Sequence, residues 1–113
     1  MEANIISDKD DNDVPYLELK FSPEHPDDTP LYITFRKYYK RVFVGVEDYS
    51  YDQTQGFDLE DVWLSPIIII EKTLIPEFDP RKAFLKALVY ADAEYLADSY
   101  EYLEPMVKRW LNG

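Results

Sequence analysis

The 113-residue chain contains no cysteine and a single histidine, His25. The absence of cysteine excludes disulfide bonds, thiolate metal sites and cysteine nucleophiles, and one histidine cannot build a histidine-based metal site. The three glycines are too scattered for a glycine-rich phosphate-binding loop. The longest run of isoleucines, residues 67–70, is far too short to span a membrane. Several large classes of catalytic and membrane protein are therefore excluded.

Acidic residues dominate the charge of the chain. There are 23 Asp and Glu against 12 Lys and Arg, a formal net charge of -11, yet 46% of the residues are hydrophobic and 16% are aromatic. This apolar content is too high for a disordered chain. The chain begins with acidic residues where a secretory signal needs a basic region. We therefore expect a soluble, folded, cytoplasmic protein, located in the host cytoplasm if it is viral.

The beginning of the chain is rich in Asp and Asn and shows no hydrophobic period. Residues 1–14 are therefore expected to form a flexible acidic tail, and residues 15–113 a single domain. Ile5 and Ile6 are the apolar exceptions, and packing of these two side chains as a short edge stays open.

Alternating apolar and polar side chains predict a series of strands after the tail. The predicted strands are residues 16–21, 31–36, 42–46 and 62–70. The second and third are close enough to form a hairpin joined near residues 37–40. Pro66 interrupts the last segment, so that a short helix starting at Pro66 is the alternative interpretation there.

The last third of the chain is predicted to be helical. Asp79 and Pro80 are a typical N-cap and first helical residue. Apolar residues that recur at helical spacing are expected to face the sheet: Leu85, Leu88, Val89, Leu96, Tyr100 and Leu103. Pro105 is expected to end or kink this helix, with one or two turns following. Strands followed by helices predict an α+β fold, a small antiparallel sheet of about four strands with C-terminal helices packed on one face.

The charge is strongly zoned along the chain. Residues 31–46 contain four Lys or Arg and no acid, whereas residues 47–61 contain six acids and no base, interleaved with tyrosines. Carboxylates on an aromatic scaffold can imitate a phosphate backbone and occupy a basic channel in another protein. The alternative is an acidic loop that only keeps the protein soluble.

We therefore predict a non-enzymatic acidic binding or inhibitor protein. Its partner would be a basic, nucleic-acid-handling protein, as for phage anti-defence and toxin-immunity proteins. The predicted partner-binding residues are Asp48, Tyr49, Tyr51, Asp52, Asp58, Glu60 and Asp61.

A second hypothesis is direct binding of single-stranded nucleic acid. Cations that meet phosphates and aromatic rings that stack on bases are typical of such surfaces. The chain offers one such cluster at the predicted hairpin: Arg36, Lys37, Tyr38, Tyr39, Lys40 and Arg41. The alternative interpretation is a hairpin tip kept soluble by its charges.

The stretch from Ile33 through RKYYKRVFVGVEDY to VWLSP resembles the PC4-like family of single-stranded DNA-binding transcription cofactors, over about a third of the chain. The resemblance implies nucleic-acid contacts at Arg36, Lys37, Lys40, Arg41 and Tyr49. The chain departs from that family in the acidic FDLED segment and in its longer C-terminal region.

No catalytic, cofactor or metal site is expected. No carboxylates are marked by spacing as a catalytic pair, and His25 has no orienting partner in sequence. The first positions of an EF-hand loop are matched from Asp8, but Asp13 stands where that loop needs glycine and Leu19 where it needs glutamate. A third hypothesis is a structural subunit that oligomerises through exposed aromatic residues, and a homodimer stays open. No membrane partner is expected.

Overall fold

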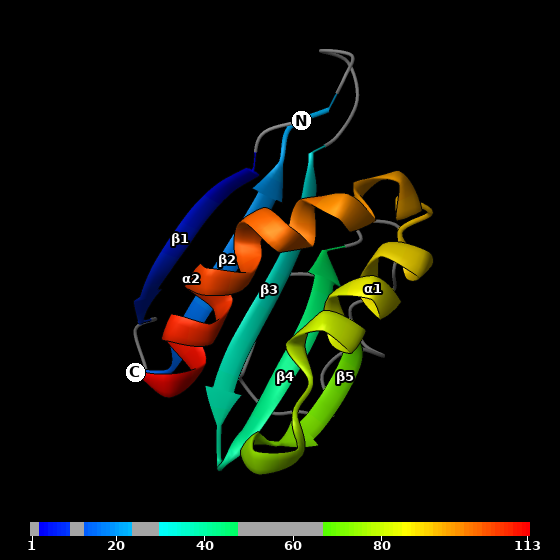
Figure 1. Cartoon of the computed structure of the whole chain (residues 1–113). Helices are drawn as coiled ribbons and strands as arrows, with labels where there is room; N and C mark the ends of the chain where they lie inside the picture. The colour runs from blue at the N-terminus through cyan, green and yellow to red at the C-terminus, as the bar shows by residue number, and fades with distance from the viewer. Residues whose placement is uncertain (1–2, 10–12, 24–29, 48–66) are drawn as a thin grey trace.

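The computed structural model describes residues 3–9, 13–23, 30–47 and 67–113. In this part of the chain, five strands precede two α-helices and two 3-10 helices (Figure 1). The strands are β1 (Ala3–Lys9), β2 (Pro15–Phe21), β3 (Leu31–Tyr38), β4 (Arg41–Glu47) and β5 (Ile67–Leu74). The helices are η2 (Ile75–Glu77), α1 (Pro80–Tyr90), η3 (Glu94–Ser99) and α2 (Tyr100–Asn112).

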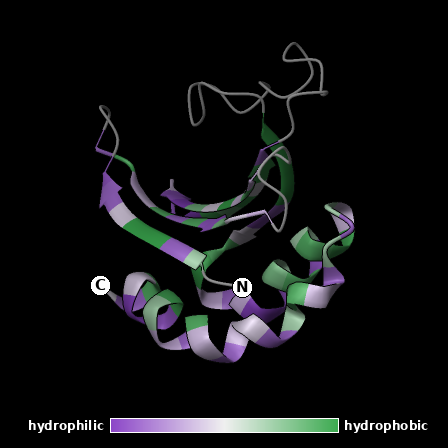
Figure 2. Cartoon of the chain, turned by 90° about the horizontal axis from the view of Figure 1, so that it is seen from above, coloured by the Kyte–Doolittle hydropathy of each residue, from purple (hydrophilic) through white to green (hydrophobic). Residues whose placement is uncertain are grey.

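The strands form one antiparallel sheet in the order β1-β2-β3-β4-β5, so that each strand pairs with its neighbours in sequence. Seen from above, the helices lie on one side of the sheet (Figure 2). The predicted α+β fold, with C-terminal helices on one face of an antiparallel sheet, is confirmed. The sheet has five strands instead of about four.

The additional strand is β1, in the segment where the sequence led us to expect a tail. Residues 3–9 pair with β2 along its whole length, from Ala3 opposite Phe21 to Lys9 opposite Pro15. Ile5 packs against the core beneath the helices, and Val14 is buried. Pairing of backbone groups along the open edge of β2 explains this strand, because such pairing requires no hydrophobic period. Residues 3–9 therefore belong to the sheet, although they lie within the segment 1–14 that was expected to form a flexible tail.

The core lies between the sheet and the helices. The predicted alternation is confirmed in the central strands, because Leu17, Phe35 and Val44 are each no more than 1% exposed and face the helices. Phe43 faces the opposite side of the sheet and belongs to a smaller apolar cluster with Ile67.

The hairpin expected near residues 37–40 is confirmed, and its turn is Tyr39–Lys40. Both residues have positive φ, 50° and 64°, which is the conformation of a two-residue turn usually made by Asn-Gly. The backbone of Lys40 is fixed by a further contact, because its carbonyl accepts a hydrogen bond from Ile75 N at 2.9 Å.

The last predicted strand continues beyond its expected end at residue 70. β5 spans Ile67–Leu74, while residues 62–66, including Pro66, lie outside the described residues. Of the two interpretations left open for this segment, the described part is a strand. A register shift at Val44/Gly45 marks its pairing with β4.

Helix α1 begins as predicted. The Asp79 side chain accepts hydrogen bonds from Arg81 N at 3.1 Å and Lys82 N at 3.3 Å, and Pro80 is the first helical residue. The face that it buries differs from the prediction, which placed Leu85 and Val89 against the sheet.

Those two side chains are 36% and 63% exposed, whereas the buried residues of α1 are Ala83, Phe84, Ala87 and Leu88. The small side chains of Ala83 and Ala87 let α1 approach the sheet closely, and Phe84 fills the space between α1 and the sheet. Leu88, Leu96, Tyr100 and Leu103, also predicted to face the core, are buried.

The helical region breaks at Asp92 and not at Pro105. Asp92 has a φ of 54°, and Ala93 N donates to the Leu88 carbonyl at 2.8 Å, the hydrogen bond of a Schellman motif. The prediction that Pro105 ends the helix near residues 102–104 is wrong, because α2 continues through Pro105 to Asn112. Burial of Leu103, Val107 and Trp110 on one face stabilises α2 despite the hydrogen bond that the proline lacks.

Among the described residues, no helix is long and apolar enough to cross a bilayer.

Candidate functional site

The antiparallel topology collects the acidic connections at one end of the sheet. Ala3 lies opposite Phe21, Phe21 opposite Leu31, and Glu47 opposite Ile67. Segments 1–2, 24–29 and 48–66 are therefore attached at the same end. Together they contain nine Asp or Glu and no Lys or Arg. We call this set of attachment points the acidic end.

The charge of the described residues is balanced. They contain twelve acids and all twelve Lys and Arg of the chain. Consequently the whole formal charge of -11 belongs to the connecting segments and the first two residues. Asp48, Tyr49, Tyr51, Asp52, Asp58, Glu60 and Asp61, the predicted partner-binding residues, all lie outside the described residues.

The six residues of the predicted nucleic-acid cluster do not form one surface. Strand alternation places Arg36 and Tyr38 on the face away from the helices and Lys37 on the face beneath them. On the outer face, Arg36 lies over the Tyr16 ring at 5.2 Å from its centroid. Such cation–π contacts occupy the aromatic face that a base would need for stacking.

The turn is the exposed part of that cluster. The Tyr39 ring is 76% exposed and makes an edge contact with Tyr38 at 4.4 Å between ring centroids. Lys40 and Arg41 are also exposed beside it. Two cations and one largely exposed ring, which contacts Tyr38 by its edge, are thus available at the tip of the hairpin.

Lys37 has a different role from the one predicted for it. Its Nζ donates hydrogen bonds to the carbonyl oxygens of Trp110 and, at 3.5 Å, of Gly113. The ammonium also lies 4.6 Å from the centroid of the Trp110 ring. Partial burial lowers the pKa of Lys37. A lysine expected at a nucleic-acid surface therefore holds the C-terminal end of α2 against β3.

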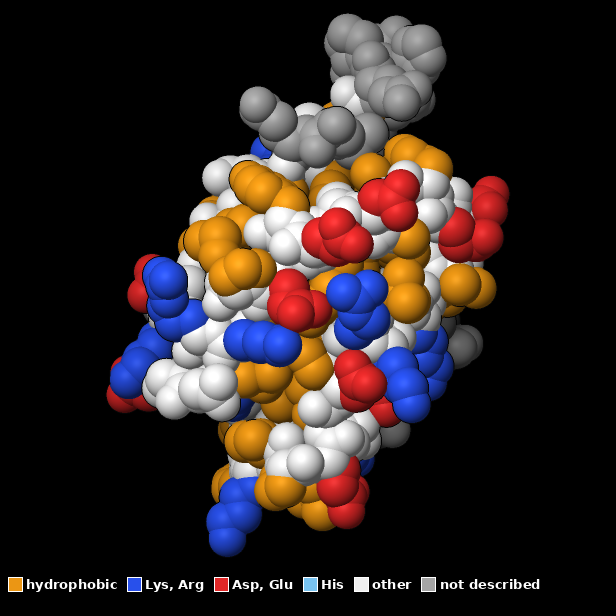
Figure 3. Space-filling model, in the orientation of Figure 1, with side chains coloured by type: hydrophobic (Ala, Val, Ile, Leu, Met, Phe, Trp, Pro, Cys, Tyr) orange, Lys and Arg blue, Asp and Glu red, His pale blue; other side chains and the backbone are white. Residues whose placement is uncertain are grey.

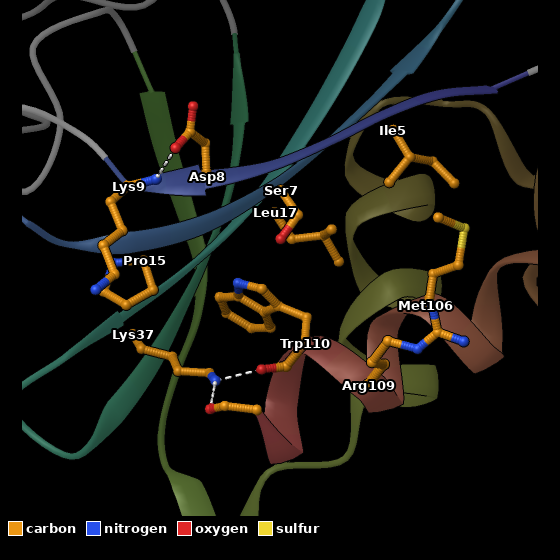
Figure 4. Close-up of a pocket in the computed structure, with 11 residues that line it drawn as sticks. Ile5, Ser7, Asp8, Lys9, Pro15, Leu17, Lys37, Met106, Arg109 and Trp110 are labelled. Carbon is orange, nitrogen blue, oxygen red and sulfur yellow. Dashed lines mark hydrogen bonds between the residues drawn. The ribbon is translucent and has the colours of Figure 1, made fainter.

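A pocket of about 730 Å³ opens beside this contact, between the N-terminal strands of the sheet and the end of α2. The sheet side is formed by Ile5, Ser7, Asp8, Lys9, Pro15, Leu17 and Lys37, and the helix side by Met106, Arg109, Trp110 and Gly113. Figure 4 shows the Trp110 ring near the middle, with Lys37 and Lys9 on one side and Met106 and Arg109 on the other. The volume is within the range of small-molecule sites.

The cations of this pocket differ from those of the helical surface. On that surface, Arg81 and Lys108 both pair with Glu104, at 3.4 and 3.0 Å. The space-filling view shows acidic and basic side chains interspersed on the face that carries the helices (Figure 3). Within the described part of the chain, no Asp or Glu side chain pairs with Lys9 or Lys37, and Lys37 is bound by the oxygens of Trp110 and Gly113 instead.

Two carboxyl groups with shifted pKa values, those of Glu18 and Glu71, lie on opposite faces of the sheet. On the outer face, burial and the nearby Glu47 carboxylate raise the pKa of Glu18. On the edge strand β5, a hydrogen bond from Thr73 at 2.7 Å and the ammonium of Lys86 lower the pKa of Glu71. Both shifts follow from local surroundings, and neither group lines the pocket.

Sequence reasoning missed Lys9, Arg109 and Trp110 as members of a site. Lys9 stood in the expected tail, and Trp110 was predicted only as part of a last helical turn. The three come together because α2 lies beside β1 and β2, which no motif or spacing in the sequence indicates.

Among residues 3–9, 13–23, 30–47 and 67–113, no group of three acidic or histidine side chains could hold a metal ion. Comparison of the chain with protein-family models, curated proteins and solved structures finds no match.

Proposed function

We propose that this protein is a non-enzymatic, cytoplasmic binding protein that docks on a basic, nucleic-acid-handling protein through the segments attached at the acidic end. Residues 48–61, with Asp48, Asp52, Asp58 and the neighbouring tyrosines, are the centre of the proposed contact. Anti-defence and toxin-immunity proteins are the functional classes that this proposal fits.

The observation that carries the proposal is the separation of charge. A charge-balanced body holds three acidic segments at one end of a single sheet, with nine carboxylates and no cation among them. Concentrated charge of one sign steers a partner of the opposite sign and accelerates association. Acids that served only solubility would not need to be attached at one end.

Direct nucleic-acid binding by the hairpin has less support. Lys37 is bound to α2, and Arg36 is stacked on Tyr16. This leaves Lys40 and Arg41 at the turn, which is a small contact for a polyanion in a protein of charge -11.

The proposal can be tested with two charge-matched variants. One carries D48N, D52N and D58N in the acidic segment, and the other carries E77Q, E94Q and D98N in the helical region, where all three side chains are exposed. Wild type and both variants are immobilised and exposed at low salt to a lysate of the cells that encode the protein. Captured proteins are identified and their association rates are measured.

A basic partner that binds wild type and the helical variant, but associates several-fold more slowly with the acidic-segment variant, supports the proposal. The difference should shrink at high salt, because the Debye length falls from ~10 Å at 0.1 M to ~3 Å at 1 M. Equal losses in the two variants would assign the acids to general charge and contradict the proposal.

Two further measurements separate the other hypotheses. Saturable, salt-sensitive binding of fluorescent single-stranded DNA, lost in K40Q/R41Q, would favour the hairpin hypothesis. A stable multimer of the purified protein in light scattering would favour the oligomeric subunit.

A further inference from the structure

The pocket beside α2 has a regular arrangement of charge and apolar surface. In the register of the sheet, Lys9 lies opposite Pro15, and continuation of the β2–β3 pairing places Pro15 opposite Lys37. The two lysines therefore flank Pro15 in one row across three strands. Neighbouring strands are about 4.8 Å apart, so that the lysine backbones are roughly 10 Å apart.

The next rows of the same face are less charged. Ser7 lies opposite Leu17, and Ile5 lies on the same face of β1, two residues before Ser7. On the helix side, Trp110 lies over this region and Met106 lies one turn earlier. On the sheet side, the pocket thus passes from a cationic row to less polar side chains over about 13 Å, the rise of four strand residues. On the helix side, Arg109 lies beside Met106.

The pocket is lined mainly by cationic side chains, although the net charge of the protein is negative. Lys9, Lys37 and Arg109 line the pocket together with one carboxylate, that of Asp8, in a chain of net charge -11. The Asp8 carboxylate accepts a hydrogen bond from Lys9 N at 2.8 Å. Among the described residues, no Asp or Glu carboxylate lies within ion-pair distance of the Lys9 ammonium. The Lys37 ammonium uses two of its three donors on oxygens of Trp110 and Gly113, which leaves one N–H for a ligand. Lys9 is exposed and Lys37 is half-buried, so that both cations are accessible to an anion that enters the pocket.

Trp110 adds an unsatisfied donor to the wall. Its side chain is 8% exposed, and its indole Nε1 has no acceptor among the described residues. Buried N–H groups are normally satisfied, so that an exception calls for an explanation, for example a bound water or ion.

We infer that this pocket binds a small amphipathic carboxylate, whose anionic group lies between Lys9 and Lys37 and whose apolar body lies along Leu17 and Trp110 towards Met106. A medium-chain fatty acid or an arylalkanoate has this shape and charge. Carboxylates form strong charge-assisted hydrogen bonds with lysine, and the apolar rows favour a body without polar groups. This site is separate from the acidic end and does not depend on the proposed docking.

The test uses octanoate and its neutral analogue octanamide as probes of the full-length protein. Binding is followed in NMR spectra through the Trp110 indole N–H signal and the Met106 methyl signal. Trp63 is the second tryptophan of the chain, and the variant W63F assigns the two indole signals. Octanoate is expected to shift the Trp110 and Met106 signals saturably and to bind about tenfold more tightly than octanamide.

The variant K9Q removes one cation of the row, and K82Q on α1 is the matched control, because both lysines are exposed. Lys37 is left intact, because it holds the end of α2. K9Q should weaken octanoate about fivefold or more and leave octanamide unchanged, whereas K82Q should keep both affinities within about twofold.

Three outcomes would overturn the inference. The first is the absence of saturable shifts at Trp110 and Met106 with octanoate. The second is equal affinity for octanoate and octanamide, which would indicate an apolar cavity without carboxylate recognition. The third is an equal loss in K9Q and K82Q, which would indicate a general charge effect.

Discussion

Lys37 and Trp110 are 73 positions apart in the chain, and a hydrogen bond joins the Lys37 ammonium to the Trp110 carbonyl oxygen. The ammonium lies over the indole ring of the same residue. The last carbonyl groups of a helix lack partners within it and carry a partial negative charge. Lys37 on β3 therefore caps α2 and connects the end of the chain to the middle of the sheet.

Replacing Lys37 by methionine should destabilise the protein by about 1–2 kcal/mol, because the C-terminal carbonyls of α2 lose a charged donor. Methionine preserves much of the apolar stem, so that the loss reports the ammonium. Urea unfolding measures the effect, and K82M on exposed α1 is the control with the same change of charge. Equal stability of K37M and wild type would show that the contact contributes nothing.

Leu88 and Leu85 compare the two faces of α1. Leu88 is fully buried, whereas Leu85 is 36% exposed. L88A should cost about 2–5 kcal/mol through lost burial and the cavity that remains, and L85A clearly less. Chemical denaturation of the two variants gives the comparison. Similar losses would mean that α1 is rotated relative to the structure described.

Ile5 and Ile6 test whether β1 belongs to the folded domain. Ile5 packs against the core, whereas Ile6 on the other face of the strand is 40% exposed. We expect I5A to lower the unfolding midpoint measurably and I6A to change it little. Amide hydrogen exchange in residues 3–9 should show protection in wild type. Two variants with unchanged midpoints would return these residues to the expected tail.

Tyr100 should make stability depend on alkaline pH. Burial raises its pKa to about 12, above the ordinary value of 10.0. In the unfolded chain the phenol ionises earlier, so that the stabilising contribution is complete below pH 10 and is lost as the pH rises from 10 to about 12. Y100F lacks this group and should lose less stability over that interval.

Comparison of Y100F with wild type removes the contribution of the other tyrosines, which both proteins share. The Tyr100 hydroxyl is buried with no hydrogen-bond partner among the described residues. At neutral pH, Y100F should therefore be at least as stable as wild type. A marked loss of stability at neutral pH would reveal a partner for that hydroxyl.

The elements with a clear hydrophobic pattern were predictable. β2 alternates strictly, the interior of β4 is a continuous run of apolar residues and glycine that is rich in valine, and Asp79-Pro80 is a strong start signal for α1. β1 was not predictable in this way, because its pairing uses backbone groups and it has few apolar side chains. The break at Asp92 was missed because a left-handed aspartate replaces the glycine that usually ends a helix.

The pocket could not be predicted from the sequence either, because the residues that line it are far apart in the chain. Lys9, Lys37 and Trp110 belong to segments that have no common motif, and only the packing of α2 brings them together. Alternation along β3 separates Lys37 from Arg36, so that a compact basic segment in the sequence becomes two environments in the structure. Consecutive basic residues on a strand are therefore divided between the two faces of the sheet and do not form one surface.

The order of elements also affects how the protein is synthesised. The five strands are made first, and the helices that cover Leu17, Phe35 and Val44 come last in the chain. Synthesis proceeds at about 5–20 residues per second, so that the helices that cover the apolar face of the sheet are made seconds after the strands. During that interval the nascent sheet resembles a surface that molecular chaperones recognise. The adjacent pairing of successive strands favours local folding during synthesis, and α2 is the last of the described elements to be synthesised.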